Sequence, residues 1–227
     1  MTHQLVRRVL AEGLGTCFLV CAVVGSGIAA QRLSPGDAGL QLLENSLITG
    51  SALLALILAL QSVSAAFNPL VTFAEVVLNR IRLRDAWALA AAQIVGGIIG
   101  TILANLMFNL SAINISTHHR ASGAHLLGEV VATFGLVVVI FGVILGRRPE
   151  NVAYAVAGYI TAAYWFTSST SFANPAVTIA RMFSNTFAGI APVSVVPFVI
   201  VQLAGAVLAV VVVRYLLPQT QPERASA

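Results

Sequence analysis

Runs of apolar residues alternate with short polar segments along almost the whole chain. A helix rises ~1.5 Å per residue, so about 20 consecutive apolar residues span a hydrocarbon core of ~30 Å. Six runs have about this length, at about 5–30, 40–61, 87–108, 125–145, 151–167 and 193–217. The pattern predicts an all-α membrane protein with six transmembrane helices.

Two further apolar segments, 68–79 and 174–185, are only about a dozen residues long. A helix in either would cross about half of the bilayer. Each segment opens with Asn-Pro, and Asn is a favoured N-cap while Pro suits the first helical position. We therefore predict two re-entrant half-helices, which start at Asn68 and Asn174 and do not span the membrane alone.

The two halves of the chain repeat each other's motifs. Asn-Pro-x-Val-Thr occurs at 68–72 and again 106 residues later, and a glutamate lies near the start of the first and fourth spans, Glu12 and Glu129. Three spans per repeat is an odd number, so the second copy must enter the membrane upside down. The prediction is one domain over 1–227, with inverted repeats at about 5–108 and 124–217 and a polar tail at 218–227.

If both half-helices start at the middle of the bilayer, the positive ends of their dipoles meet there and each Asn presents an amide N–H₂ group. Such a site suits a neutral, hydrogen-bonding solute and disfavours a cation. The residues predicted to meet are Asn68, Pro69, Leu70, Asn174, Pro175 and Ala176.

Composition supports a membrane protein, since 58% of the residues are hydrophobic and only 9% are charged. The twelve basic residues are all arginines and lie in short clusters between apolar runs, which indicates topology and not nucleic-acid binding. The positive-inside rule predicts cytoplasmic termini for a multi-pass protein of the plasma (inner) membrane. The arginines on this side are Arg7, Arg8, Arg80, Arg82, Arg84, Arg147, Arg148, Arg214 and Arg224.

No group of residues predicts an enzyme, a metal centre or a cofactor. Cys17 and Cys21 lie four residues apart on the first span and are expected to pack against a neighbouring helix. His118, His119 and Arg120 lie in the polar loop 109–123, and without further ligands they predict a solvated loop tip. The expected partners are a lipid bilayer and small neutral solutes.

The paired Asn-Pro motifs, each followed by Val-Thr, resemble those of the aquaporin and aquaglyceroporin (major intrinsic protein) family over about residues 7–217. The resemblance implies an aquaporin-like fold and a passive channel, assembled as a homotetramer with one pore per subunit. It also implies that Glu12 and Glu129 brace the re-entrant loops by accepting hydrogen bonds from their backbone.

In that family four positions form the narrowest constriction. The resemblance assigns three of them to Ala162, Ser171 and Val177, the last where Arg is usual. The second-span position is Thr49 if a neighbouring glycine is matched, and Ile48 if residues are simply counted. None of these is a large aromatic residue or a histidine, so we expect a wide constriction that lacks a fixed positive charge.

This pattern resembles bacterial aquaglyceroporins associated with arsenic resistance, which implies passage of arsenite, methylated arsenicals, glycerol-like polyols and water. The alternatives are a water pore narrowed by Leu70, Trp165 or Phe172, an ion-coupled secondary transporter, and a non-conducting structural member.

Arg181 follows Val177 by one helical turn. It is expected either to supply a positive charge to the outer vestibule or merely to pair with loop groups.

Overall fold

The computed structural model describes residues 2–217, which form α-helices joined by loops and two short 3-10 turns, with no strand in that range. The helices are α1 His3–Leu33, α2 Ala38–Leu60, α3 Pro69–Val77, α4 Leu83–Met107, α5 Gly123–Leu145, α6 Val152–Phe166, α7 Pro175–Ala180 and α8 Pro192–Leu216. The 3-10 turns are η1 Pro149–Asn151 and η2 Arg181–Phe183. The predicted polar tail, 218–227, lies outside the described residues.

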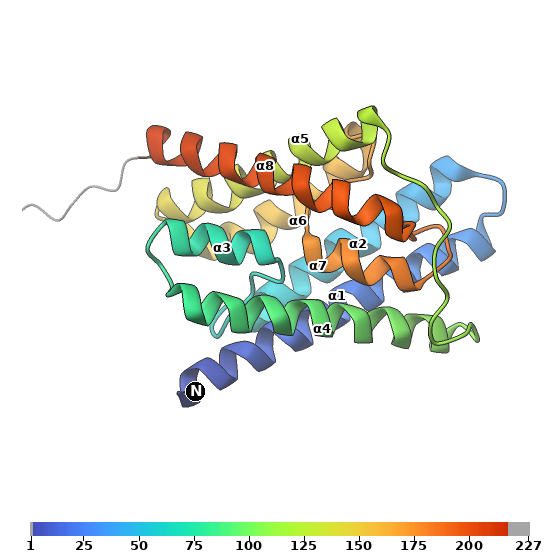
Figure 1. The fold of residues 1–227 in the computed structure, drawn as a ribbon, viewed down its shortest axis with the longest axis horizontal. Helices are drawn as coiled ribbons and strands as arrows, with labels where there is room; N and C mark the ends of the chain where they lie inside the picture. The colour runs from blue at the N-terminus through green and yellow to red at the C-terminus, as the bar shows by residue number, and fades with distance from the viewer. Residues whose placement is uncertain (1, 218–227) are drawn as a thin grey trace, which may run out of the picture.

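All six predicted spans are helices, and they run along the long axis of the molecule (Figure 1). Helices α1, α2, α4, α5 and α8 have 23 to 31 residues and are apolar enough to cross a membrane. Helix α6 has only 15 residues, or ~22 Å, and directly follows η1. The all-α fold with six long helices is therefore confirmed.

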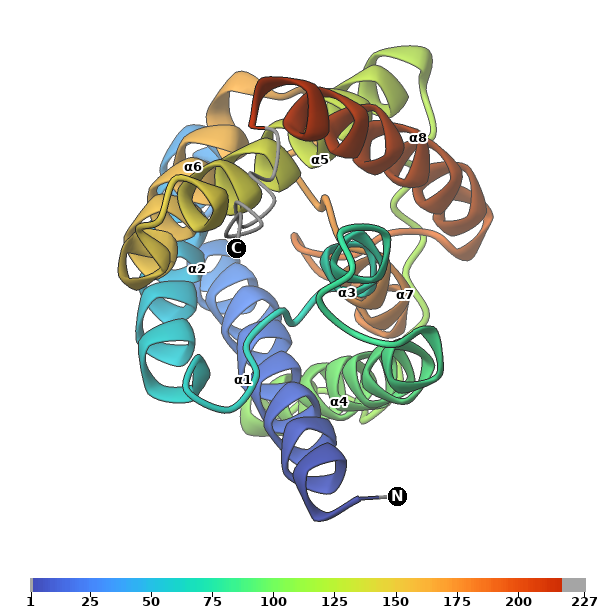
Figure 2. The same ribbon diagram turned by 90° about the vertical axis from the view of Figure 1, so that its left-hand side faces the viewer.

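The two short helices, α3 and α7, lie inside the ring formed by the six longer ones (Figure 2). Both are shorter than predicted, because α3 has nine residues and α7 has six, continued by the three residues of η2. On α4, Thr101 donates to the carbonyl of Ala180 and Asn105 to that of Phe183. Because α7 ends early, these carbonyls have no donor from a further helical turn, and the two side chains supply one.

Close helix contacts are equivalent in the two repeats. A Cβ on Gly96 of α4 would lie 2.1 Å from the carbonyl oxygen of Gly13 on α1, and one on Gly205 of α8 would lie 2.6 Å from that of Val130 on α5. Only glycine permits such a backbone approach. Cys17 lies in the same α1–α4 contact, as expected of a packing residue, and remains a free thiol.

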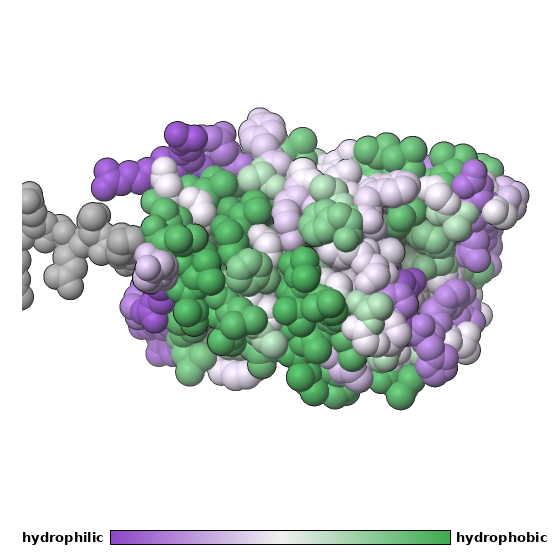
Figure 3. All heavy atoms as spheres, turned by 90° about the horizontal axis from the view of Figure 1, so that it is seen from above, coloured by the Kyte–Doolittle hydropathy of each residue, from purple (hydrophilic) through white to green (hydrophobic). Residues whose placement is uncertain are grey.

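Large apolar side chains cover the outside of the bundle, among them Phe18, Trp87 and Ile200. Between its two ends the face in Figure 3 is mostly apolar, and hydrophilic residues gather toward the ends. Such an apolar band is unstable in water and suits lipid. Together with the membrane-length helices, it makes the chain a multi-pass membrane protein. The start of α1 and the end of α8 lie at the same end of the bundle (Figure 1).

Candidate channel and its constriction

The two Asn-Pro loops meet inside the bundle and bind each other through their asparagines. The Nδ2 group of Asn68 donates to the carbonyl of Ala173 at 2.8 Å, and that of Asn174 donates to the carbonyl of Phe67 at 2.7 Å. Both accepting residues have a left-handed φ of 48°, which is uncommon outside glycine. The crossed hydrogen bonds therefore join two strained loops into one unit.

Each asparagine also caps its own half-helix. The Oδ1 atom of Asn68 accepts from the N–H of Leu70 at 3.0 Å, and that of Asn174 accepts from the N–H groups of Ala176 and Val177 at 2.9 and 3.3 Å. A proline occupies the first helical position in both cases. The positive ends of α3 and α7 thus face each other, and each Asn amide keeps one N–H beyond its crossed bond.

Glu12 of α1 is buried beneath the first loop and accepts four hydrogen bonds. The backbone N–H groups of Ala66 and Phe67 donate to its two oxygens at 2.8 and 2.7 Å, and Ser64 and Gln93 donate from their side chains. A carboxyl group within a membrane span is tolerated when its oxygens are satisfied in this way.

Glu129 of α5 occupies the equivalent position beneath the second loop. The backbone N–H groups of Phe172 and Ala173 donate to its two oxygens, both at 2.9 Å, and Gln202 of α8 donates from its side chain. Gln202 also donates to Thr178 at 2.9 Å, just as Gln93 donates to Thr72 in the first repeat. The same contacts therefore hold both half-helices.

A cavity of ≈ 560 Å³ runs past both asparagines. At the end near the chain termini it is lined by Arg8, Glu75, Arg80 and Glu150, and this opening is termed the terminal mouth. Its opposite end is termed the far constriction, and the residues that line it are Thr49, Tyr164, Ser171, Phe172, Val177 and Arg181. The paired half-helices thus border a continuous internal space.

Comparison with known proteins identifies the family. A sequence profile described as "Major intrinsic protein" matches residues 1–151, more than half of the chain. The chain is also 49% identical over 220 residues to aquaglyceroporin AqpS of Rhizobium meliloti, an alignment that covers 96% of this chain and 94% of that protein. The chain belongs to the major intrinsic protein family.

Two further relatives show lower identity to this chain. Aquaporin A of Dictyostelium discoideum is 34% identical over 178 residues, or 73% of this chain and 63% of that protein. The X-ray structure of the aquaglyceroporin from Plasmodium falciparum superposes with a TM-score of 0.69 at 19% identity, over 94% of this chain and 98% of that one. This last likeness is one of fold. The family consists of passive channels and not of enzymes.

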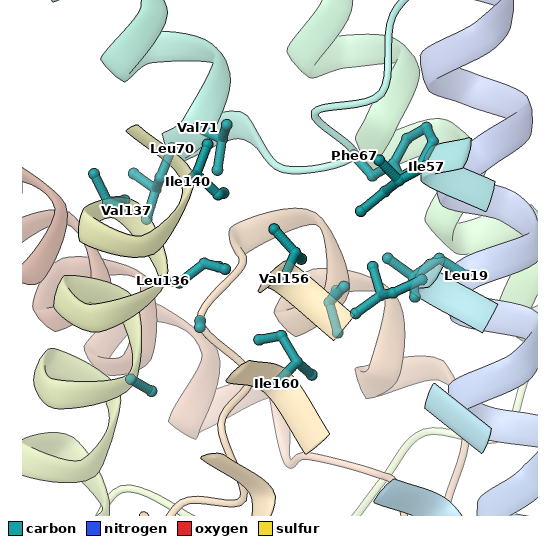
Figure 4. Close-up of a cluster of buried hydrophobic side chains, with 14 of the residues drawn as sticks. Leu19, Ile57, Phe67, Leu70, Val71, Leu136, Val137, Ile140, Val156 and Ile160 are labelled. Carbon is teal, nitrogen blue, oxygen red and sulfur yellow. The ribbon is translucent and has the colours of Figure 1, made fainter. Parts of the chain in front are cut away.

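Leu70, which the sequence offered as a residue that could narrow the pore, is not among the residues that line the cavity. It is only 6% exposed and packs in the apolar cluster with Val137 of α5, beside Val71 and Ile140 (Figure 4). The cavity wall near the asparagines is made instead by aliphatic side chains from four helices: Leu19, Val23, Ile57, Leu136, Ile140, Val156 and Ile160.

Two residues predicted for the constriction face away from the channel, and these predictions were wrong. Ile48 is 49% exposed on the outside of α2, whereas its neighbour Thr49 is buried and lines the cavity. Ala162 is exposed on α6, whereas Tyr164 lines the cavity. The lining residues of α6 recur every four positions, at Val152, Val156, Ile160 and Tyr164. Residue 162 is turned about 160° around the helix from both Ile160 and Tyr164.

The far constriction therefore contains large aromatic side chains, contrary to the expectation. Tyr164 is only 3% exposed, and its hydroxyl lies 3.1 Å from that of Thr49 on α2. The buried ring of Phe172 packs edge-on against Phe198, with centroids 5.3 Å apart. Trp165 points outward, and its indole N–H donates to Ser46, so it does not narrow the channel. Ser171, Val177 and Tyr164 all line this end of the cavity.

Arg181 lines the same constriction and is not in an open vestibule. It is only 2% exposed, its guanidinium carbon lies 3.5 Å from the centroid of the Phe172 ring, and its Nε–H donates to the carbonyl of Ala188. The residue therefore faces the cavity and also pairs with a loop group, while its contribution to the charge of the pore stays a prediction. Its counterpart in the first repeat, Glu75, lies at the terminal mouth, 4.0 Å from Arg8.

His118 and His119 are exposed, as predicted for a loop tip, but the loop that carries them is fastened to the segment that follows α7. Along 109–122, termed the strap, the N–H groups of Asn114 and Ser116 donate to the carbonyls of Phe183 and Met182 at 3.0 and 2.9 Å. Arg120 continues this attachment with its side chain. Hydropathy had no means to detect the strap, since nearly every one of its bonds has a backbone group as donor or acceptor. The one available signal was a lone arginine in a loop otherwise free of Asp, Glu, Lys and Arg.

Proposed function

We propose that the protein is a passive channel for small uncharged solutes: glycerol-like polyols, arsenite, methylated arsenicals and water. One observation carries the proposal, namely that the cavity passes both asparagines and has Val177 where Arg is usual in the family. The similarity to AqpS, an aquaglyceroporin, supports passage of polyols.

The composition of the wall suits solutes that carry hydroxyl groups on a compact body. Aliphatic side chains form most of the wall, while Asn68 and Asn174 offer amide N–H donors and Ser171 and Tyr164 offer hydroxyl groups. A polyol or a neutral arsenic hydroxide can exchange its water for these donors and acceptors while its apolar side stays on the aliphatic wall. A cation meets the positive ends of two helix dipoles and is disfavoured.

Arg181 contributes to this rejection in the proposed mechanism. It lies at the constriction one turn beyond Val177 and carries the positive charge that the family usually has at position 177. We further infer that the terminal mouth faces the cytoplasm in an inner membrane, that Glu12 and Glu129 brace the loops, and that the protein assembles as a homotetramer.

A water-selective channel is the second candidate, and the aromatic side chains favour it. Tyr164 and Phe172 both line the far constriction, and the Tyr164 hydroxyl is near that of Thr49 on the neighbouring helix. Such a constriction excludes solutes by size even without an arginine at position 177.

Stopped-flow light scattering of proteoliposomes in water, glycerol and arsenite gradients separates these functions. We expect glycerol and arsenite permeabilities several times those of empty liposomes, without saturation or dependence on a proton or sodium gradient. Raised water permeability alone indicates the water-selective channel, and saturable, gradient-dependent flux indicates a transporter. Permeability equal to that of empty liposomes indicates a non-conducting member and contradicts the proposal.

A further inference from the structure

Two guanidinium groups converge behind the far constriction on one short loop. Three consecutive carbonyls of this loop accept from them: Phe187 from Arg120 at 2.9 Å, Ala188 from Arg181, and Gly189 from Arg120 at 2.8 Å. Both groups also lie over the ring of Phe172, at 5.3 Å for Arg120 and 3.5 Å for Arg181. The strap and the second half-helix thus bring two positive charges together.

Neither of these two charges has an acidic partner within residues 2–217, where the ion pairs involve only Arg8, Arg82 and Arg84. The carboxylate beneath the second Asn-Pro loop, Glu129, already accepts from Phe172, Ala173 and Gln202. Two guanidinium groups and one carboxylate leave a net positive charge. A buried charge is costly unless it is paired, so a bound anion would stabilise this part of the channel.

Arg181 has hydrogen-bonding capacity directed into the cavity. A guanidinium has five N–H donors, and in the described part of the chain only Nε–H of Arg181 has a partner. The side chain is buried yet lines the cavity, so its terminal N–H groups are available there. The hydroxyl of Ser171, which lines the same end, is also buried and has no partner within residues 2–217.

We propose that the far constriction binds a small monocarboxylate, and that the bound anion blocks solute passage. The planar guanidinium fork of Arg181 matches the two oxygens of a carboxylate. Ser171 supplies a further donor, and Val177 and Phe172 supply an apolar surface for a short alkyl group. A single negative charge balances the net charge of the site, whereas a phosphate dianion does not.

The anion stops at this point because the channel beyond it cannot replace these contacts. Further in, the wall is aliphatic at Leu136, Ile140 and Val156, and each Asn amide has only one N–H beyond its crossed bond. Moving a carboxylate into such surroundings is strongly unfavourable, because its charge loses its hydrogen-bond partners. The anion bound at this site therefore blocks the channel and does not permeate it. The inference rests on the proposed channel for uncharged solutes and identifies small monocarboxylates as its inhibitors.

The direct test is isothermal titration calorimetry of the purified full-length protein in detergent. Sodium formate and sodium acetate are each titrated into the protein, and sodium chloride and sodium phosphate are titrated at matched ionic strength for comparison. We expect saturable binding of both carboxylates, with weaker or no response to the other two anions. Arg181→Gln and Arg181→Lys should each raise Kd at least about tenfold, because a charge-assisted bond is lost or the fork geometry is destroyed.

Ser171→Ala keeps both arginines and removes an unpartnered hydroxyl, so it tests the site with little risk to folding; we expect Kd to rise severalfold. Arg148→Gln, an exposed residue near the opposite end of the bundle, is the matched charge control and should bind like the wild type. Equal affinity for chloride, unchanged Kd in both Arg181 variants, or absence of carboxylate binding would each overturn the proposal.

Water permeability of proteoliposomes supplies the functional half of the test, with formate at equal concentration on both sides so that it adds no osmotic gradient. We expect formate to lower wild-type permeability at least threefold and to leave the Arg181→Gln variant unaffected. Binding without any loss of permeability would refute the proposed block. Because calorimetry needs no transport, failure of the carboxylate site remains distinguishable from failure of the proposed channel activity.

Discussion

Replacing Glu12 by glutamine tests whether a buried carboxylate holds the first re-entrant loop. Each carboxylate oxygen accepts two hydrogen bonds: one from Ser64 and Ala66, the other from Phe67 and Gln93. An amide group has one oxygen only. Whichever way the glutamine is oriented, its N–H₂ group faces a backbone N–H, so either Ala66 or Phe67 loses its acceptor.

The magnitude follows from these contacts. An unsatisfied buried N–H costs roughly 1–3 kcal/mol, and the remaining hydrogen bonds lose the strengthening that the charge provides. We expect Glu12→Gln to lower the free energy of unfolding by about 3 kcal/mol, which corresponds to a Tm lower by about 6–12 °C on the scaling for globular domains of this size. Because the carbonyl of Phe67 also accepts from Asn174, the loosened loop should lower solute flux as well.

Thermal unfolding in detergent, followed by intrinsic fluorescence, measures this effect. Glu129→Gln should give a similar loss, because Glu129 has equivalent partners in the second repeat. Glu150→Gln changes an exposed glutamate at the terminal mouth and is the control for loss of charge alone. If Glu12→Gln and Glu150→Gln melt at the same temperature, the reasoning about the loop is refuted.

Three further predictions concern the far constriction. Tyr164→Ala should admit five-carbon polyols that the wild type excludes, whereas Tyr164→Phe, which loses only the contact with Thr49, should keep the wild-type size limit; osmotic swelling in a polyol series distinguishes them. Val177→Arg should lower glycerol and arsenite permeability more than water permeability, and equal losses would place the constriction elsewhere. Arg181→Gln should raise the leak of small cations into dye-loaded proteoliposomes, and an unchanged leak would remove its proposed role in charge rejection.

The six spans and the starts of the half-helices could be predicted because their causes are local. Membrane-spanning length requires only a run of apolar residues, and the Asn-Pro caps act on the turn that they begin. That the loops of Asn68 and Asn174 meet could be predicted from the repeat, because equivalent segments of two inverted halves come together at the midplane. The crossed hydrogen bonds to the carbonyls of Phe67 and Ala173 could not be predicted, since they depend on a left-handed backbone conformation that these residue types do not indicate.

The constriction was harder to predict because position counting ignores helical register. On α6, Ala162 faces the outside while Tyr164, two residues later, lines the cavity. On α2, Ile48 faces the outside while the next residue, Thr49, lines the cavity. Arg120 reaches the same region only because the strap is fastened to the loop after α7. That contact joins residues about 70 positions apart through backbone carbonyls, which carry no sequence signature.

Glycerol permeability of a variant with a filled cavity tests most directly whether the space between the half-helices is the conducting path. Val156 lines the cavity beside the asparagines, whereas Ile48 faces the outside of the bundle, so Val156→Trp and Ile48→Trp add a similar bulk to the two sides of the wall. With equal amounts of correctly assembled protein, we predict that Val156→Trp falls to the permeability of empty liposomes and that Ile48→Trp matches the wild type. Undiminished glycerol flux through Val156→Trp would contradict the account.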